Sequence, residues 1–287
     1  MSTAQSLQNA MSVDVEDYFQ VSAFERYVPR EDWEKIPCRV EANVDRILQL
    51  FADQGVSATF FTLGWMAERY PQMLKRIVEQ GHEVASHGWS HVRVTQQNRE
   101  QFREDVVRTK GMLEDVGGQA VLGYRAASYS IGEKNLWALE VLNETGHRYS
   151  SSIFPIRHDL YGMPGAPRFA FNPHDDHFIE FPVTTVRLGG RNLPCAGGGW
   201  FRLVPYPLMR QAMRRVNKHD GEAVIFYFHP WEIDPEQPRM PGLDAKTRFR
   251  HYLNLKRTEK RLQRLLADFR WGTMASLLPA GDAGGVA

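Results

Sequence analysis

The sequence contains little cysteine, no long apolar run and no excess of charge. Cys38 and Cys195 are the only cysteines among 287 residues, which excludes a disulfide framework and argues against a thiolate zinc site. A single bridge between these two cysteines stays open. With 35 basic and 34 acidic residues the net charge is +1, so the composition does not indicate binding to nucleic acid.

Membrane-spanning and secretory segments are also missing from the pattern. No stretch approaches the roughly 18 consecutive apolar residues of a transmembrane helix. The opening segment MSTAQSLQNA has neither the basic nor the apolar part of a secretory signal. We therefore expect a soluble, cytoplasmic protein without a transmembrane segment, and leave peripheral association with the inner membrane open.

Short apolar stretches alternate with segments of helical period along most of the chain. Apolar stretches typical of strands occupy residues 11–15, 57–63, 82–85, 120–124 and 223–228. Helical periodicity covers residues 41–54, 71–80, 99–116, 133–145, 205–218 and 244–267. This alternation predicts an α/β fold with a parallel sheet, either open or closed into a barrel.

Two irregular segments interrupt this rhythm. Residues 150–181 are rich in proline, histidine and aromatic side chains, and residues 189–199 form a glycine-rich loop. Because no linker is visible, residues 11–278 are predicted to form a single domain. Residues 1–10 and 279–287 are expected to be disordered.

The clearest local motif is Ser-His-Gly-Trp-Ser-His, directly after the strand predicted at residues 82–85. His87 and His91 lie four positions apart, so their imidazoles can meet at one point on a helix or in a loop. Imidazoles at this spacing are common ligands of zinc and similar metals. The alternative is a pair of histidines with ordinary hydrogen-bond partners in the core or at the surface.

An acidic cluster follows the first predicted strand. Asp14, Glu16 and Asp17 place three carboxylates within four residues, and such clusters need a cation or solvent to offset their mutual repulsion. A carboxylate beside two imidazoles would complete a three-ligand metal site with an open position. An acidic, solvated turn is the alternative.

Two further predicted strands end on charged or titratable residues. His229 follows the apolar stretch 223–228, and Arg125 follows residues 120–124. The carboxyl ends of barrel strands are where catalytic groups collect, whereas a core histidine and a surface arginine are the alternatives. Each signal is modest alone, but four strand ends with these residue types indicate an enzyme site.

In this order the segments DVEDYF, GHEVASHGWSH, GYRAASYSI, SSIFPIRHD and FHPWEID resemble the polysaccharide deacetylase family. This family is also called carbohydrate esterase family 4, or the NodB-homology domain. The chain looks most similar to the branch encoded with exosortase and PEP-CTERM exopolysaccharide loci, and the resemblance covers residues 11–278. It implies a distorted (β/α) barrel of seven strands with an extra C-terminal helical and loop region.

The resemblance also implies an activity, which is metal-dependent removal of N-acetyl groups from hexosamine units of an exopolysaccharide or its precursor. A lipid-linked precursor stays open as the substrate. By motif, Asp14 is expected to be the general base, Arg125 to orient Asp14, and His229 to be the general acid. The metal is expected to be Zn²⁺, with Co²⁺, Ni²⁺ or Fe²⁺ as alternatives.

The expected metal ligands are His87, His91 and one carboxylate. The family has two adjacent aspartates where this chain has Asp-Val-Glu-Asp, so the carboxylate could be Glu16 or Asp17. We prefer Asp17, because its shorter side chain lies past the strand, where the turn can fold back.

Two other departures bear on activity. Ala127 stands where the family has proline, and Ser150 stands where it has the aspartate that supports the catalytic histidine. Asp159 and Asp234 are candidates to replace that aspartate. These two departures are the only support for one alternative function, a catalytically weakened carbohydrate-binding protein. A second alternative is another amidohydrolase on the same scaffold that cleaves a C–N bond outside sugars.

Aromatic side chains near the motifs are candidates for stacking on sugar rings, with core packing as the alternative for each. These candidates are Trp89, Tyr129, Trp200 and Trp231. The basic helix predicted at residues 244–267 is expected to present a solvated face. The oligomeric state is not predicted.

Overall fold

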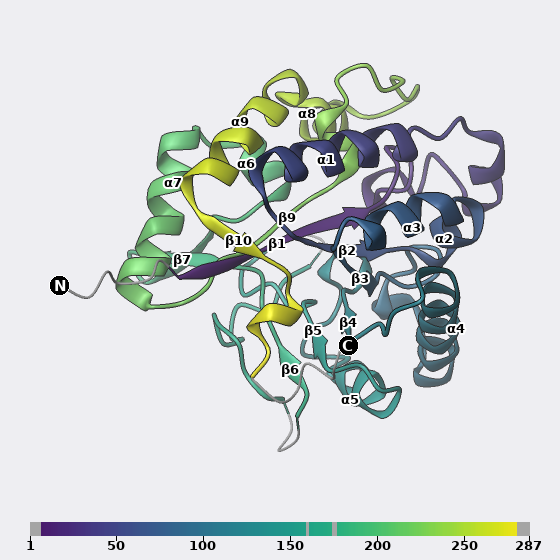
Figure 1. Cartoon of the computed structure of the whole chain (residues 1–287), viewed down its shortest axis with the longest axis horizontal. Helices are drawn as coiled ribbons and strands as arrows, with labels where there is room; N and C mark the ends of the chain where they lie inside the picture. The colour runs from purple at the N-terminus through teal and green to yellow at the C-terminus, as the bar shows by residue number, and fades with distance from the viewer. Residues whose placement is uncertain (1–6, 159–160, 174–176, 280–287) are drawn as a thin grey trace.

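A parallel sheet forms the centre of the computed structural model, which describes residues 7–158, 161–173 and 177–279 (Figure 1). Its strands follow the order β10 (Arg270–Gly272), β1 (Gln8–Val15), β2 (Thr59–Thr62), β3 (Glu83–Ser86), β4 (Gly123–Tyr124), β5 (Tyr149–Ser150) and β6 (Ile179–Glu180). A further strand, β9 (Ile225–Phe228), also pairs with β1. This half-barrel of parallel strands confirms the predicted α/β fold class.

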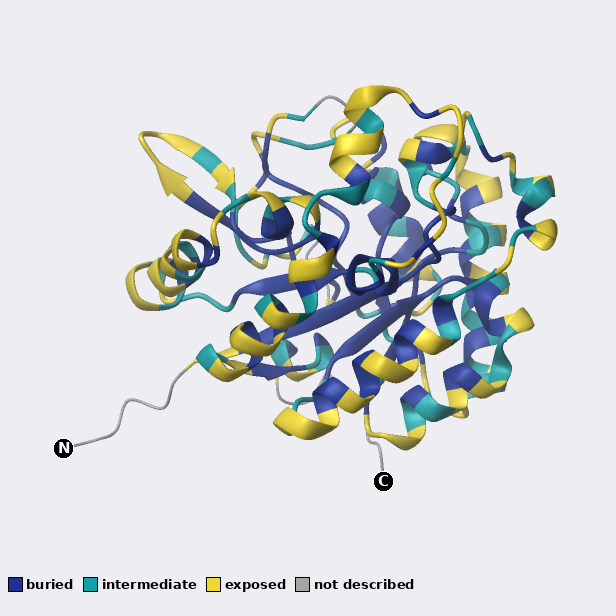
Figure 2. Cartoon of the chain, turned by 90° about the horizontal axis from the view of Figure 1, so that it is seen from above, coloured by how far each residue is buried: buried dark blue, intermediate teal, exposed yellow. Residues whose placement is uncertain are grey.

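Helices cover the outer face of the sheet. They are α1 (Val40–Gln54), α3 (Pro71–Glu79), α4 (Arg99–Gly117), α5 (Trp137–Glu144), α7 (Tyr206–Arg215) and α9 (Leu255–Asp268). Figure 2 shows buried strands inside, with the exposed residues of these helices turned outward. Shorter helices are α2 (Gly64–Arg69), α6 (Gly198–Leu203) and α8 (Ala245–Tyr252), and a hairpin joins β7 (Thr185–Leu188) to β8 (Arg191–Pro194).

The central strand β1 separates the hydrophobic core from the polar interior. Met11, Val13 and Val15 belong to the apolar cluster formed with the outer helices. Because successive residues of a strand face opposite sides, Ser12 and Asp14 point into the half-barrel instead. The interior of the half-barrel is therefore polar beside β1, and its outer face is apolar.

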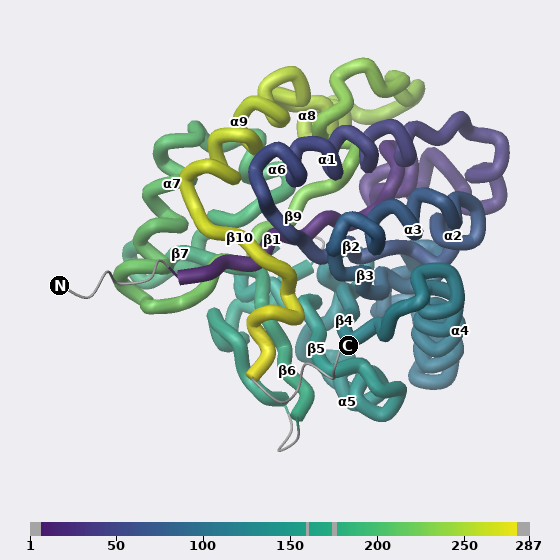
Figure 3. Tube along the Cα trace, viewed as in Figure 1, coloured from purple at the N-terminus to yellow at the C-terminus, as the bar shows by residue number. Residues whose placement is uncertain are grey.

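The C-terminal part of the chain contributes directly to this sheet. Residues 10–13 of β1 pair with β9, residues 8–10 pair with β10, and residues 12–15 pair with β2. In the trace of Figure 3, β9 and the yellow β10 run beside the purple β1. Strands from both ends of the sequence thus build one sheet.

Three expectations about order and regularity differ from the structure. Residues 8–10, expected to be disordered, belong to β1, because β10 and β9 provide them with backbone partners. The continuous helix expected at residues 244–267 is divided into α8 and α9 at Asn254, whose φ is 56°. The glycine-rich loop contains β8 and the start of α6. Residues 1–6 and 280–287 lie outside the described part.

Two predictions from composition can be compared with the described residues. Cys38 and Cys195 are both free, so the bridge between them that stayed open is absent. Within residues 7–158, 161–173 and 177–279, no helix is both long and apolar enough to cross a bilayer.

Candidate metal and catalytic site

The motif residues meet at the carboxyl ends of four strands. Asp14 lies at the end of β1, His87 directly follows β3, Arg125 follows β4 and His229 follows β9. Parallel strands place these ends on one edge of the sheet, where α/β enzymes carry their active sites.

A buried cluster of one carboxylate and two imidazoles forms the centre of this site. Glu16 Oε1 lies 3.1 Å from Nε2 of His87 and 3.1 Å from Nε2 of His91. Ligand atoms of the three residues all lie within 4.8 Å of one another, and all three residues are buried. Two neutral imidazoles and a carboxylate are a donor set that fits zinc and related divalent ions.

The charge balance of the cluster also suits a cation. Burial would raise the pKa of the Glu16 carboxyl, but the imidazoles of His91 and His229 hold it well below its usual range. His87 is fixed by its second nitrogen, because Nδ1 lies 2.8 Å from the carbonyl oxygen of Arg125. Such a bond donates Nδ1–H and leaves Nε2 unprotonated toward the site.

The position of Asp17 differs from the preferred expectation. Its carboxylate accepts hydrogen bonds from the backbone N–H groups of Tyr18, Arg39 and Val40, and does not join the imidazole cluster. Burial raises the pKa of Asp17 to about 6 despite these bonds. The structure therefore favours Glu16, the alternative carboxylate, over Asp17.

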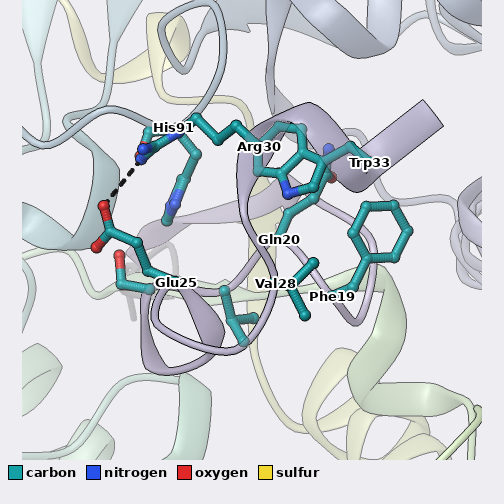
Figure 4. Close-up of a pocket in the computed structure, with 9 residues that line it drawn as sticks. Phe19, Gln20, Glu25, Val28, Arg30, Trp33 and His91 are labelled. Carbon is teal, nitrogen blue, oxygen red and sulfur yellow. Dashed lines mark hydrogen bonds and ion pairs between the residues drawn. The ribbon is translucent and has the colours of Figure 1, made fainter. Parts of the chain in front are cut away.

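The two histidines are presented by a loop rather than by a helix. Gly88 has φ 74° and His91 has φ 55°, so two left-handed residues turn the segment back on itself. Arg30 donates from Nε to the carbonyl oxygen of Ser90 at 2.8 Å and from Nη2 to that of His91 at 3.0 Å. Figure 4 shows Arg30 and Glu25 beside His91 in the small pocket behind the loop.

The predicted base is held by the predicted arginine. Arg125 is fully buried, and its Nη1 donates to Asp14 Oδ1 at 2.6 Å and to Ser12 Oγ at 2.8 Å. Its other nitrogens donate to the carbonyl oxygen and the hydroxyl of Ser151. The second oxygen of Asp14, Oδ2, lies 3.5 Å from the hydroxyl of Tyr129. Arg125 thus fixes the carboxylate while Oδ2 stays directed toward the site.

His229 lies across the site from Asp14. Its Nε2 is 3.9 Å from Asp14 Oδ2 and 3.8 Å from Glu16 Oε1, and its side chain is 17% exposed. Burial would lower the pKa of His229, but the carboxylates of Glu16 and Glu232 raise it to about 9. His229 therefore combines partial access to solvent with a strongly negative surrounding.

The support for His229 comes from a residue that the sequence reasoning missed. Nδ1 of His229 lies 2.7 Å from Glu232 Oε1. Of the expected substitutes, Asp234 pairs with Arg39 instead, and Asp159 lies outside the described residues. The spacing in the sequence could have indicated Glu232. A glutamate three residues after His229 can accept hydrogen bonds from the backbone N–H and the ring of His229 at the start of the short helix Pro230–Ile233.

The aromatic candidates have different surroundings. Tyr129 and Trp231 are each only 5% exposed, and Trp231 stacks between His229 and His251. Trp89 is half-buried with the Arg108 guanidinium over its ring, and Trp200 packs partly against the core. Trp231 thus lies against His229 with little exposed surface, whereas Tyr129 alone among the four reaches Asp14.

Two family models divide the chain. Residues 33–150 match the model described as polysaccharide deacetylase, and residues 151–279 match one described as a domain of unknown function, DUF3473. The first match contains His87, His91 and Arg125, and the second contains His229. The single domain expected over residues 11–278 is thus covered by two models, although its strands share one sheet.

Relatives of known description cover part of the chain. The peptidoglycan-N-acetylglucosamine deacetylase of Bacillus cereus is 34% identical over 96 residues, which are 33% of this chain and 35% of that protein. The chitooligosaccharide deacetylase of Sinorhizobium fredii is 30% identical over 143 residues, 50% of this chain and 60% of that protein. The chain therefore spans less than two thirds of the length of either relative.

Solved structures are similar over nearly the whole chain. A crystal structure from Mycobacterium smegmatis, described as a polysaccharide deacetylase, superposes with a TM-score of 0.61 at 17% identity, covering 97% of this chain and 91% of that one. A carbohydrate esterase family 4 pseudoenzyme from Bacillus anthracis gives 0.50 at 14% identity, covering 96% and 67%. At these identities the likeness shows the fold alone.

Proposed function

We propose that this chain is a metal-dependent hydrolase that removes N-acetyl groups from hexosamine units of a polysaccharide. Residues 33–150 match the polysaccharide deacetylase family model, which supports this activity. The observation that carries the proposal is the buried cluster of Glu16, His87 and His91. Asp14 and His229 lie beside it at the same edge of the sheet, so ligands, base and acid occupy one site.

The metal would be held by Glu16 Oε1 and the Nε2 atoms of His87 and His91. When bound, a divalent ion would activate water and polarise the acetamide carbonyl. We propose Zn²⁺ as this ion, because two imidazoles and one carboxylate are typical of catalytic zinc sites, with Co²⁺, Ni²⁺ and Fe²⁺ as the ions to compare.

The remaining residues would move the protons. Asp14, held by Arg125, takes a proton from the attacking water through Oδ2. His229 gives a proton from Nε2 to the amine nitrogen as the C–N bond breaks, so that water and the acetamide become acetate and the free amine. Tyr129, whose hydroxyl lies 3.5 Å from Asp14 Oδ2, would help to keep that oxygen directed at the substrate.

The substrate we propose is an N-acetylated exopolysaccharide or its precursor, free or lipid-linked, met in the cytoplasm or at the inner membrane. Support for the sugar amide comes from the two relatives, which are named for deacetylation of peptidoglycan N-acetylglucosamine and of chitooligosaccharides. Assignment to the exosortase-associated branch is part of the same proposal and rests on the five segments DVEDYF, GHEVASHGWSH, GYRAASYSI, SSIFPIRHD and FHPWEID.

Acetate release from N-acetylglucosamine oligomers tests this function. We expect release by the Zn²⁺-loaded protein, loss of release after chelation and recovery after adding Zn²⁺ back. Asp14→Asn should keep the metal and lower kcat by about 100-fold or more, because the general base is gone. If no acetylated glycan releases acetate in a metal-dependent way, the proposal is wrong, and glycan binding without turnover would favour a carbohydrate-binding protein.

A further inference from the structure

The region that matches a domain of unknown function, residues 151–279, encloses one side of the site. It carries His229 at the end of β9, and β9 pairs with the central strand β1. It also carries the two groups that lie behind His229, Glu232 and Arg202, which are both almost fully buried. This region is therefore part of the catalytic architecture rather than a separate module.

We propose that Glu232, held in place by Arg202, is the positioning residue for His229. One role of residues 151–279 is then to supply Glu232 and Arg202 to the site. Glu232 Oε1 accepts hydrogen bonds from Nδ1–H of the His229 ring at 2.7 Å and from the backbone N–H of His229 at 3.1 Å. The other carboxylate oxygen of Glu232, Oε2, accepts a hydrogen bond from Arg202 Nε at 2.6 Å. The inference rests on the proposed role of His229 as the general acid.

The geometry determines which nitrogen of His229 faces the substrate. A carboxylate can only accept hydrogen bonds, so Glu232 requires the proton of the ring to be on Nδ1. Nε2 is then the nitrogen that faces Asp14 and Glu16 and exchanges protons with the site. A second group that orients a catalytic histidine through its far nitrogen is a recurrent device in hydrolases.

Arg202 fixes Glu232 and also holds the aromatic side chains that pack against the His229 ring. Its Nη1 donates to the carbonyl oxygens of His251 and Leu253, at 2.7 and 3.0 Å. The His251 ring stacks on Trp231 at 4.2 Å between centroids, and Trp231 stacks on His229 at 5.2 Å. One buried guanidinium therefore anchors both the carboxylate and the aromatic stack that hold His229.

The other acidic and polar groups considered for this role are engaged elsewhere. The Asp234 carboxylate accepts hydrogen bonds from Nε and Nη2 of Arg39. The Ser150 hydroxyl donates to the hydroxyl of Ser152. The family's aspartate is thus replaced by Ser150, which also bonds to the buried Glu180 carboxylate, whereas the carboxylate that supports His229 is Glu232 in the turn after it.

The test compares Glu232→Gln with Glu232→Asp in the full-length, Zn²⁺-loaded protein. The amide has one acceptor oxygen, which Arg202 Nε–H should take, so its NH₂ would face His229 Nδ1 and move the ring proton to Nε2. We expect Glu232→Gln to lower kcat for deacetylation by about 100-fold, with KM and metal content little changed. Glu232→Asp should restore much of the rate, because it restores an acceptor.

Asp234→Asn is the matched control, since it removes a buried charge two residues away that does not touch His229. It should keep kcat within about threefold of the unchanged protein, whatever it costs in stability. Equal losses of kcat in Asp234→Asn and Glu232→Gln would show a structural role and overturn the proposal.

A readout without turnover separates this inference from the proposed function. Nitrogen-15 NMR of the histidine rings, at a pH where His229 is neutral and with His229→Gln to assign its signals, reports which nitrogen carries the proton. We expect Nδ1–H in the unchanged protein and Nε2–H in Glu232→Gln. The same tautomer in both would overturn the inference, whereas the expected switch in a protein without deacetylase activity would overturn only the proposed function.

Discussion

At the scale of the residue, the division of labour between Glu16 and Asp17 follows from one turn of the backbone. The N–H of Glu16 donates to the carbonyl oxygen of Asp14 at 2.9 Å, so the chain turns immediately after β1. Asp14 and Glu16 consequently both face the site. Asp17 turns away and accepts the N–H groups of Arg39 and Val40, so that it caps the N-terminus of α1.

This arrangement predicts opposite results for two neighbouring acidic residues. Glu16→Gln should weaken Zn²⁺ binding by about 100-fold or more, because a neutral amide replaces the charged ligand. Asp17→Asn should bind Zn²⁺ normally and lose about 1–2 kcal/mol of unfolding free energy, because the cap of α1 is weakened. Zinc titration and urea unfolding of both proteins measure these effects, and loss of metal from Asp17→Asn alone would reverse the assignment.

At the scale of the element, the amino-terminal ends of the strands are tied together opposite the site. Tyr149 of β5 reaches past β4 and donates to Glu83 of β3 at 2.7 Å. The second carboxylate oxygen of Glu83 accepts from Thr59 of β2 and from the backbone of Ala275. The hydrogen bond from Tyr149 to Glu83 across β4 is possible only because Gly123 has no side chain, since a Cβ there would overlap the Tyr149 ring.

The same requirement distinguishes two glycines. Gly123→Ala should destabilise the protein by about 1–3 kcal/mol, because the Tyr149 ring must move and its bond to Glu83 is strained. Gly111→Ala is the control, because Gly111 lies inside α4 and nothing lies within 4 Å of its added Cβ. The control should stabilise the protein by about 1 kcal/mol through helix propensity. Urea unfolding that shows equal effects for both would contradict the packing argument.

At the scale of the whole molecule, periodicity and motif order in the sequence predict the long strands and helices and most of the site. They do not predict features that depend on contacts between distant segments. The alternation of strands and helices is confirmed, as in α1, which begins one residue before its predicted start. Strands of two or three residues such as β6 and β10 carry too few side chains for a period, and they form because β5 and β1 offer free edges. Glu232 was missed because its role depends on a turn that brings it back to His229.

Stability at low pH is a property of the whole fold that specific buried histidines should control. His147 is 1% exposed, and burial lowers its pKa to about 3, with Lys110 adding to the shift. Burial likewise lowers the pKa of His82 to about 4. Between these values and about 6.5 the unfolded chain binds protons that the folded chain does not, so these groups reduce stability as pH falls from neutral.

Buried carboxyls act in the opposite sense, because burial raises the pKa of Asp17 and Asp105 to about 6 and their protonation favours the folded state. A comparison of variants isolates the histidine contribution from theirs. His147→Gln should reduce the loss of unfolding free energy between about pH 7 and about pH 4.5 by roughly 3 kcal/mol. His219→Gln, which makes the same substitution at an exposed side chain, is the matched control. Urea unfolding at a series of pH values measures both variants, and parallel curves for His147→Gln and the unchanged protein would contradict a lowered pKa of His147 in the folded state.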